Sequence, residues 1–226
     1  EAVPFVLETI KLLRRELDSS VAMIGFAGAP FTLAGYLIEG KPSREFLITK
    51  TMMYTEPALW DALMTRLSRL VLDYLLAQID AGAQLVQLFD SWVGCLSPAD
   101  YRRYVQPHVA GIFKGLRRAD SPSIHFGTGT AGILSLMREA GGDVIGVDWR
   151  VDLGEAWGVI GYDRGIQGNL GPAVLLAPWP LIEDGARRVT EAAGGRPGHI
   201  FNLGHGVLPA SPVENLQRLV EFVHAA

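Results

Sequence analysis

Cysteine is nearly absent from this sequence. Cys95 is the single cysteine among 226 residues, which excludes an internal disulfide and any zinc site built from several cysteines. Proteins without disulfides are typical of reducing compartments. We therefore expect a cytoplasmic protein.

Long apolar runs are lacking as well. No stretch reaches the roughly 18 consecutive apolar residues that a membrane-spanning helix needs. The first segment, residues 5–17, differs from the apolar core of a signal peptide because charged side chains interrupt it. These side chains are Lys11, Arg14, Arg15 and Glu16. We expect no association with a membrane.

Charge of one sign does not accumulate anywhere along the chain. Twenty Lys and Arg residues stand against 24 Asp and Glu residues, which gives a net charge of −4. No basic run is available for a phosphate backbone or an anionic lipid surface. A nucleic-acid partner is therefore not expected.

Apolar residues are abundant, and they indicate a folded protein. They make up 49% of the sequence and charged residues only 19%, so enough apolar surface is present to offset the entropy of ordering the chain. No repeat, low-complexity tract or linker divides the sequence. We predict a single domain over residues 1–226, somewhat shorter than the roughly 250 residues of a typical β/α barrel.

Six short runs have the composition of buried strands, and each precedes a helical stretch. They are Val21–Phe26, Leu85–Phe89, Ser123–Phe126, Val144–Val147, Gly165–Gln167 and His199–Leu203. Several are apolar almost throughout, which is typical of parallel strands that are covered on both faces. Alternation with segments of 3.6-residue period predicts βαβ units.

Two architectures contain such units. A dinucleotide-binding sheet requires a glycine fingerprint after its first strand, and the spacing in Gly25–Phe26–Ala27–Gly28 does not match it. Six strands are too few to close an eight-stranded barrel. We therefore predict an α/β fold, a truncated (β/α)8 TIM barrel with about six of its eight parallel strands.

Helix positions follow from caps and periodicity. Residues 31–82 contain no strand pattern, and we predict an active-site loop with a short helix at 31–39, a helix at 43–54 and a longer one at 57–81. Ser97 and Ser211 each precede a proline and are followed by an acid three residues later. This pattern predicts a serine N-cap with proline at the first helical position.

The polar residues at the strand ends are the candidate site, because barrel enzymes place their chemistry there. These strand ends carry His125, Asp148, Arg150, Gln167, Asn202 and His205. His205 lies between Gly204 and Gly206, and glycines on both sides allow the backbone to approach a ligand. Ser91 is interpreted as a binding hydroxyl, because no Gly-x-Ser-x-Gly motif surrounds it.

Other polar residues permit two interpretations. Asp90 is either a pocket acid or a buried structural carboxylate. Tyr36 either projects from the loop after the first strand or packs in the core. His125 lacks a second ligand at metal spacing and is interpreted as a satisfied strand-end histidine. Asp148 is expected to anchor loops, with Arg150 as its partner.

Several motifs in order along the chain resemble the uroporphyrinogen decarboxylase family. They are Gly25–Phe26–Ala27–Gly28–Ala29–Pro30–Phe31–Thr32–Leu33 with Tyr36 and Glu39–Gly40, Phe89–Asp90–Ser91–Trp92, Phe126–Gly127–Thr128–Gly129, Gly146–Val147–Asp148–Trp149–Arg150, Gln167–Gly168–Asn169–Leu170 and Asn202–Leu203–Gly204–His205–Gly206. Each motif alone is weak evidence, but together they are specific.

The resemblance implies a cytoplasmic homodimer in tetrapyrrole (haem and chlorophyll) synthesis. Such an enzyme, a carboxy-lyase, converts uroporphyrinogen III into coproporphyrinogen III by decarboxylating four acetate side chains, with no metal or organic cofactor. The resemblance also implies that Tyr36, Ser91 and His205 contact the substrate, with Tyr36 and His205 catalytic. Phe26 and Phe89 match apolar residues of its cleft.

The resemblance also has gaps. The family's arginine-rich segment and its substrate-binding aspartate precede the matched region, so we expect this chain alone to be inactive. Gly171 stands where the family usually has aspartate. The alternatives are a zinc-dependent corrinoid methyltransferase of the same superfamily, whose cysteine ligands are absent here, and a catalytically inactive barrel fragment.

Overall fold

A computed structural model describes residues 4–41 and 43–225 of the chain. Its centre is one parallel sheet in which strand order follows sequence order, from β1 to β6. The strands are β1 (Ile24–Gly28), β2 (Leu85–Asp90), β3 (Ser123–Gly127), β4 (Val144–Gly146), β5 (Gly165–Leu170) and β6 (His199–Leu203). Sequential parallel order with helical crossovers is the arrangement of a β/α barrel. The predicted fold, a barrel with six of its eight strands, is confirmed.

The α-helices connect successive strands. They are α1 (Pro4–Glu16), α2 (Pro30–Glu39), α3 (Leu47–Thr55), α4 (Pro57–Asp80), α5 (Pro98–Tyr104), α6 (Gln106–Leu116), α7 (Leu134–Ala140), α8 (Leu153–Ile160), α9 (Trp179–Ala193) and α10 (Val213–Ala225). Short 3-10 turns lie at Val93–Cys95, Ala131–Ile133 and Pro172–Leu176. Among the described residues, no helix combines the length and apolar character needed to cross a membrane.

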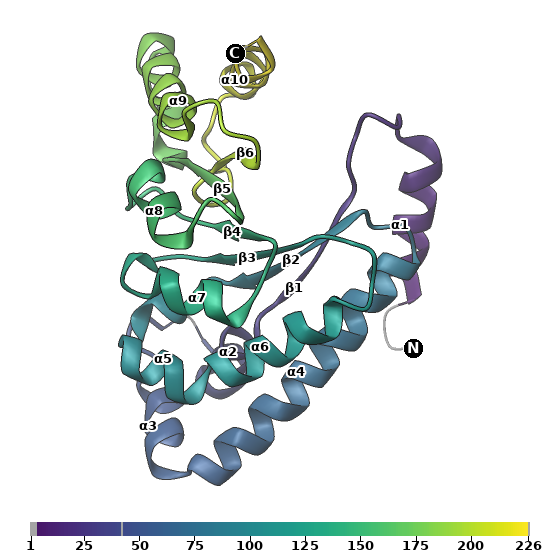
Figure 1. The fold of residues 1–226 in the computed structure, drawn as a ribbon, viewed down its shortest axis with the longest axis vertical. Coiled ribbons are helices and arrows are strands. Elements are labelled where there is room, and N and C mark those ends of the chain that lie inside the picture. Colours follow the sequence, from purple (N-terminus) through teal and green to yellow (C-terminus); the bar gives the residue numbers. More distant parts are fainter. Residues whose placement is uncertain (1–3, 42, 226) are drawn as a thin grey trace.

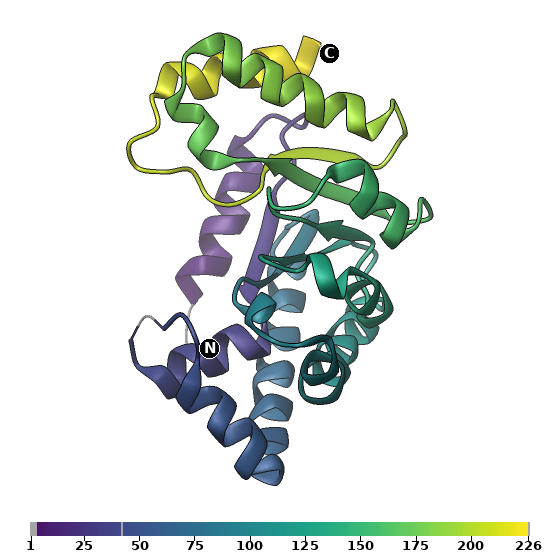
Figure 2. The same ribbon diagram turned by 90° about the vertical axis from the view of Figure 1, so that its left-hand side faces the viewer.

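The helices cover one face of the sheet, which we call the helix face (Figure 1). Helices α4 to α7 lie along β1–β3, and α9 and α10 lie beside β5 and β6. Turning the molecule by 90° shows α9 and α10 stacked together above the remaining layers (Figure 2). Helix α1 stands at the far side of the molecule, where Ile10 packs on Ala81 and Ala83.

Burial of large side chains between the sheet and the helices stabilises this layer. Trp60, Tyr101 and Trp157 are almost completely buried. The indole N–H groups of Trp60 and Trp157 donate to backbone carbonyls at 3.0 and 2.8 Å, so their burial leaves no indole donor unpaired. The larger of two hydrophobic clusters joins elements from α2 to α10, and the smaller one holds Ile10 of α1.

The other face of the sheet is concave, and we call it the lumen face. Side chains alternate between the two faces along each strand, so Gln87 and Phe89 point to the lumen while Leu88 points to the helices. Gln167 Nε2 donates to Gln87 Oε1 at 3.1 Å, although β5 and β2 are three strands apart in the sheet. A direct contact between them requires the sheet to curl around the lumen.

Two predicted boundaries are wrong by several residues. The first strand begins at Ile24 instead of Val21, because the N–H of Val21 turns back to Asp18 and its carbonyl accepts from Arg14. Helix α3 begins at Leu47 instead of Ser43, because the Ser43 hydroxyl accepts from the N–H of Phe46 in a turn before the helix.

Of the two predicted serine caps, the one at Ser97 is confirmed and the one at Ser211 is wrong. The loop predicted before α2 is absent. The Ser97 hydroxyl accepts from the N–H of Asp100 at 3.1 Å, with Pro98 at the first helical position. Helix α10 begins at Val213, so Ser211 lies outside the cap position, and its buried hydroxyl has no hydrogen-bond partner among the described residues. Helix α2 begins directly at Pro30, and the chain 31–39 is helical throughout.

Candidate functional site

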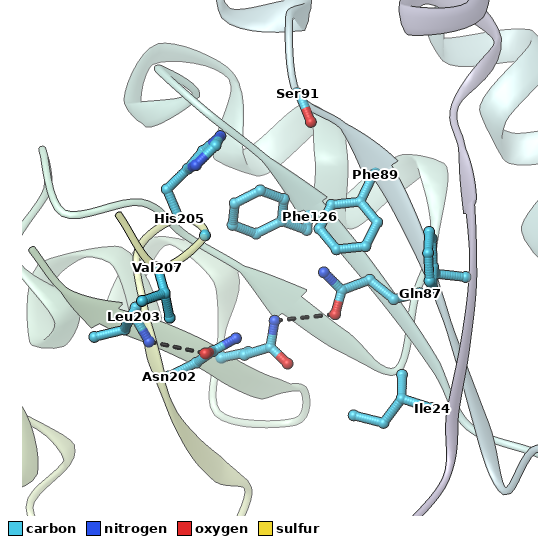
Figure 3. A pocket seen from close by; sticks show the side chains of 12 residues that line it. Ile24, Gln87, Phe89, Ser91, Phe126, Asn202, Leu203, His205 and Val207 are labelled. Atoms are coloured by element: carbon cyan, nitrogen blue, oxygen red, sulfur yellow. Dashed lines mark hydrogen bonds between the residues drawn. The ribbon is translucent and has the colours of Figure 1, made fainter. Parts of the chain in front are cut away.

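A cavity of about 490 Å³ opens on the lumen face at the carboxyl ends of the strands (Figure 3). Its walls come from β1, β2, β3, β5 and β6 and from the loops that follow β2 and β6. The lining residues are Ile24, Phe26, Gln87, Phe89, Ser91, Phe126, Gln167, Asn202, Leu203, His205, Gly206 and Val207. Four of the five predicted site residues are therefore in one place: Phe26, Phe89, Ser91 and His205.

Three phenylalanines from neighbouring strands form one wall of the cavity. Phe26 and Phe89 meet edge to face at 5.7 Å between ring centroids, and Phe89 and Phe126 at 5.4 Å. Edge-to-face geometry is the favourable arrangement for such rings. Phe26 is 61% exposed, so this wall offers an apolar surface to a ligand.

His205 faces this wall from the loop after β6 (Figure 3). The glycine before it has a different role from the predicted one. A side chain at Gly204 would lie 2.4 Å from the backbone nitrogen of Trp149, so glycine is needed there to let the two backbone segments pack closely. Gly206 has open space around it, and the approach of a ligand to its backbone stays a prediction. The His205 ring meets Trp149 edge to face at 6.5 Å.

Asp148 anchors the loops around the site, as predicted, with Arg150 as its partner. Its side chain accepts from the N–H of Gly129 at 2.8 Å, from the N–H of Arg150 at 3.1 Å and from the Arg150 guanidinium. Its carbonyl accepts from Asn169 Nδ2 at 2.9 Å. The loops after β3 and β4 and strand β5 are therefore joined at one residue, Asp148.

Ser91 lies at the upper edge of the cavity (Figure 3). Its carbonyl accepts from the Thr128 hydroxyl, and close packing of Gly94 against the Thr128 carbonyl holds the same two loops together. The Ser91 hydroxyl has no hydrogen bond to a base among residues 4–41 and 43–225. Such a hydroxyl is suited to binding and lacks the partner that a nucleophile needs.

Tyr36 does not line the cavity. It lies on α2, 60% exposed, and its ring stacks on Trp92 at 4.1 Å between centroids. Neither interpretation from the sequence is right, because Tyr36 projects from a helix and not from a loop, and it is not in the core. Trp92 directly follows Ser91, so this stacking brings Tyr36 near the loop after β2.

Asp90 is a buried structural carboxylate, which decides between the two interpretations left open by the sequence. It points to the helix face, where Oδ1 accepts from the Thr32 hydroxyl at 3.1 Å. Burial raises the pKa of Asp90 to about 7, and the bond from Thr32 opposes that rise. Its other oxygen has no partner among the described residues.

His125 is not the satisfied strand-end residue that the sequence predicts. It lies inside β3, completely buried against Phe113 at 5.0 Å between ring centroids. Neither ring nitrogen has a hydrogen-bond partner in the described parts of the chain. Burial lowers the pKa of His125 to about 4, and the nearby backbone of Met137 and Gly141 opposes that shift in part.

The floor of the cavity was assigned only in part by sequence reasoning, which placed Gln167 and Asn202 at strand ends but did not single out Gln87. It consists of the amides of Gln87 and Gln167, joined by their hydrogen bond, with Asn202 beside them (Figure 3). Gln87 is two residues before Phe89, so strand alternation alone would have placed both on one face. Within the described residues no group of three potential metal ligands is present.

Comparison with known proteins identifies close relatives. The family model for uroporphyrinogen decarboxylase (URO-D) matches residues 1–226. A uroporphyrinogen decarboxylase from Sorangium cellulosum is 52% identical over 225 residues, which cover 100% of this chain and 64% of that protein. One from Thermus thermophilus is 57% identical over 223 residues, which cover 99% and 64%. The chain thus spans about 64% of the length of these relatives.

Solved structures share the fold at lower identity. A methyltransferase from Methanosarcina mazei superposes with a TM-score of 0.83 at 24% identity, over 99% of this chain and 64% of that chain. A B12-independent methionine synthase from Shewanella sp. W3-18-1 superposes with a TM-score of 0.64 at 10% identity, over 97% and 66%. These likenesses concern the fold alone.

Proposed function

This chain belongs to the uroporphyrinogen decarboxylase family, and from that premise we propose that the protein decarboxylates the four acetate side chains of uroporphyrinogen III. The product is coproporphyrinogen III, an intermediate of haem and chlorophyll synthesis. The observation that carries the proposal is the cavity at the strand ends, in which an aromatic wall faces His205 and Ser91.

The chemistry fits a cavity of this composition. Loss of carbon dioxide breaks a carbon–carbon bond and leaves its electron pair on the former acetate carbon. A pyrrole that has been protonated at its ring carbon accepts that pair, a second proton completes the methyl group, and the first proton then leaves the ring carbon so that the pyrrole is restored. The substrate is its own electron sink, so the protein supplies position, charge complementarity and a site of low polarity.

The roles of the lining residues follow from their chemistry. We assign the phenylalanines, including Phe26 and Phe89, to packing against the macrocycle. Ser91 and His205 are the hydrogen-bonding groups that meet its acidic side chains. Tyr36 would reach the substrate from the rim, since it stacks on Trp92 next to Ser91.

The charge of the substrate sets a requirement that the cavity does not meet alone. No Lys or Arg is among the lining residues within 4–41 and 43–225, whereas several carboxylates call for cationic partners. We therefore propose activity for the protein at its full natural length and not for residues 1–226 alone. Membership of the family also supports the proposal that the protein acts as a cytoplasmic homodimer.

The proposal predicts the effect of two substitutions on turnover in the full-length protein. His205→Ala should lower kcat roughly 100-fold, the usual effect of removing a group that stabilises developing charge. Tyr36→Phe should lower it about tenfold, as expected for loss of one hydrogen bond to a charged group. Chromatography of the oxidised porphyrins after incubation with uroporphyrinogen III measures both.

A matched control is available on α10. His224 is exposed there, and His224→Ala should leave turnover unchanged while making the same chemical change as His205→Ala. Wild-type rates in His205→Ala and Tyr36→Phe would contradict the assigned roles. Absence of decarboxylation by the wild-type protein would contradict the function itself.

A further inference from the structure

The floor of the cavity holds two buried amides that are only partly hydrogen-bonded. Gln87 is 5% exposed and Gln167 is 2% exposed. A primary amide has two N–H donors and an oxygen that accepts up to two bonds. Their mutual bond of 3.1 Å uses one donor of Gln167 and one acceptor of Gln87. The two donors of Gln87 have no hydrogen-bond partner among residues 4–41 and 43–225.

This bond fixes the direction of the Gln87 amide. Because Oε1 accepts from Gln167, Nε2 must point away from Gln167. In Figure 3 the Gln87 nitrogen points up into the cavity, toward the side where Phe126 and His205 lie.

The Gln87 nitrogen is not among the fully buried side-chain atoms that lack a partner in the described residues, so it borders the open cavity, where a ligand can reach it. Neither Phe89 nor Phe126 can accept a conventional hydrogen bond from it. The cavity space above the amide is therefore where an acceptor belongs. Carboxylate oxygen is the strongest acceptor available in an acidic substrate.

We propose that Gln87 is a substrate-binding residue, which donates a hydrogen bond from Nε2 to a carboxylate oxygen of the porphyrinogen, and that Gln167 is its positioning residue. This inference rests on the proposed function and adds the floor of the cavity to the contacts of the site. It explains why two amides occupy lumen positions of β2 and β5 where barrel interiors are commonly filled by branched apolar residues.

The test is binding of uroporphyrin III, the oxidised and stable form of the substrate, to the full-length protein, measured by fluorescence titration. Gln87→Met removes both donors and keeps a similar length. It should raise Kd roughly ten- to a hundredfold, the range for a hydrogen bond to a charged group. Gln167→Met leaves the donors in place but frees their direction, so its effect should stay within about threefold.

A second substitution gives a signature that lost packing cannot produce. Gln87→Glu keeps the acceptor for Gln167 but donates only when the carboxyl is protonated. Its Kd relative to wild type should therefore fall as pH is lowered from 8 to 6, whereas the ratio for Gln87→Met should stay constant. His205 is the other titratable side chain among the described lining residues, so the same pH series is repeated in His205→Gln, where the fall in the ratio for Gln87→Glu should persist.

The outcomes separate the inference from the function on which it rests. Wild-type binding in Gln87→Met, with weakened binding in His205→Ala, overturns the inference and leaves the function intact. A constant ratio for Gln87→Glu across pH also overturns it. A wild-type protein that neither binds uroporphyrin III nor decarboxylates the porphyrinogen overturns both. Should Gln87→Met not fold, Gln87→Asn withdraws the amide by one methylene and supplies the same test.

Discussion

The two faces of β2 and β3 have opposite requirements, although their residues alternate along the same strands. On the helix face, Leu88, Asp90 and His125 are buried to 1% exposure or less. On the lumen face, Phe89 and Gln87 border an open cavity of about 490 Å³. On the helix face, burial shifts the pKa values of Asp90 and His125 toward the neutral forms, while the lumen face keeps hydrogen-bonding groups available to a ligand. Stability and binding are thus assigned to alternate residues of one strand.

The sharpest test of this comparison uses neighbouring residues of β2. Leu88→Ala should lower the free energy of unfolding by about 2–5 kcal/mol, because it leaves a cavity in the packed helix face. Phe89→Ala should lower the free energy of unfolding clearly less, because the Phe89 ring borders a space that is already open. It should instead weaken the binding of uroporphyrin III. Urea unfolding and fluorescence titration of both variants measure the two effects. Equal loss of stability in both would break the distinction between the faces.

A second test concerns Asp90, whose pKa is raised by burial from its ordinary value of 3.8 to about 7. Between these values the native state holds a proton that the unfolded chain has lost, so this residue's contribution is present at pH 4 and is lost as pH rises through 7. The free energy of unfolding of Asp90→Asn, relative to that of wild type, should therefore rise by roughly 2–4 kcal/mol between pH 4 and pH 8. Urea unfolding across this range measures the difference. A pH-independent difference between the two proteins would show that Asp90 is charged in the native state.

The third test has the opposite sign and a smaller expected size. Burial lowers the pKa of His125 to about 4, so between pH 6.5 and 4 the unfolded chain binds a proton that the native state does not. The contribution of His125 to the free energy of unfolding is present above pH 6.5 and is lost as pH falls toward 4. Between pH 6.5 and pH 4, the free energy of unfolding of His125→Gln should fall by on the order of 2–3 kcal/mol less than that of wild type. If wild type and variant lose stability in parallel on acidification, His125 has another source of stabilisation.

The sequence predicted the fold because strand runs and helix periods are local signals. Six apolar runs became the six strands, and the capping pattern at Ser97 gave the start of α5 correctly. Ser211 has the same pattern but does not cap its helix. Ser211 instead closes a turn, in which its N–H donates to the carbonyl of Leu208 at 2.9 Å.

The site was predictable where motifs follow strands and unpredictable where contacts cross the lumen. Ser91 and His205 were found from their positions at strand ends. The Gln87–Gln167 bond joins residues 80 apart in the chain, and only curvature of the sheet brings them together. Burial of His125 between β3 and Phe113 likewise depends on packing between distant segments.

The Asp148 anchor has a thermodynamic consequence for ligand binding. Gly129, Arg150 and Asn169 are already held by this one residue in the free protein, so the loops at the mouth of the cavity are ordered before any ligand arrives. Association then loses little conformational entropy from these loops, and a larger part of each contact is retained as affinity. Preorganisation of this kind shows itself in amide hydrogen exchange that barely changes when the cavity fills.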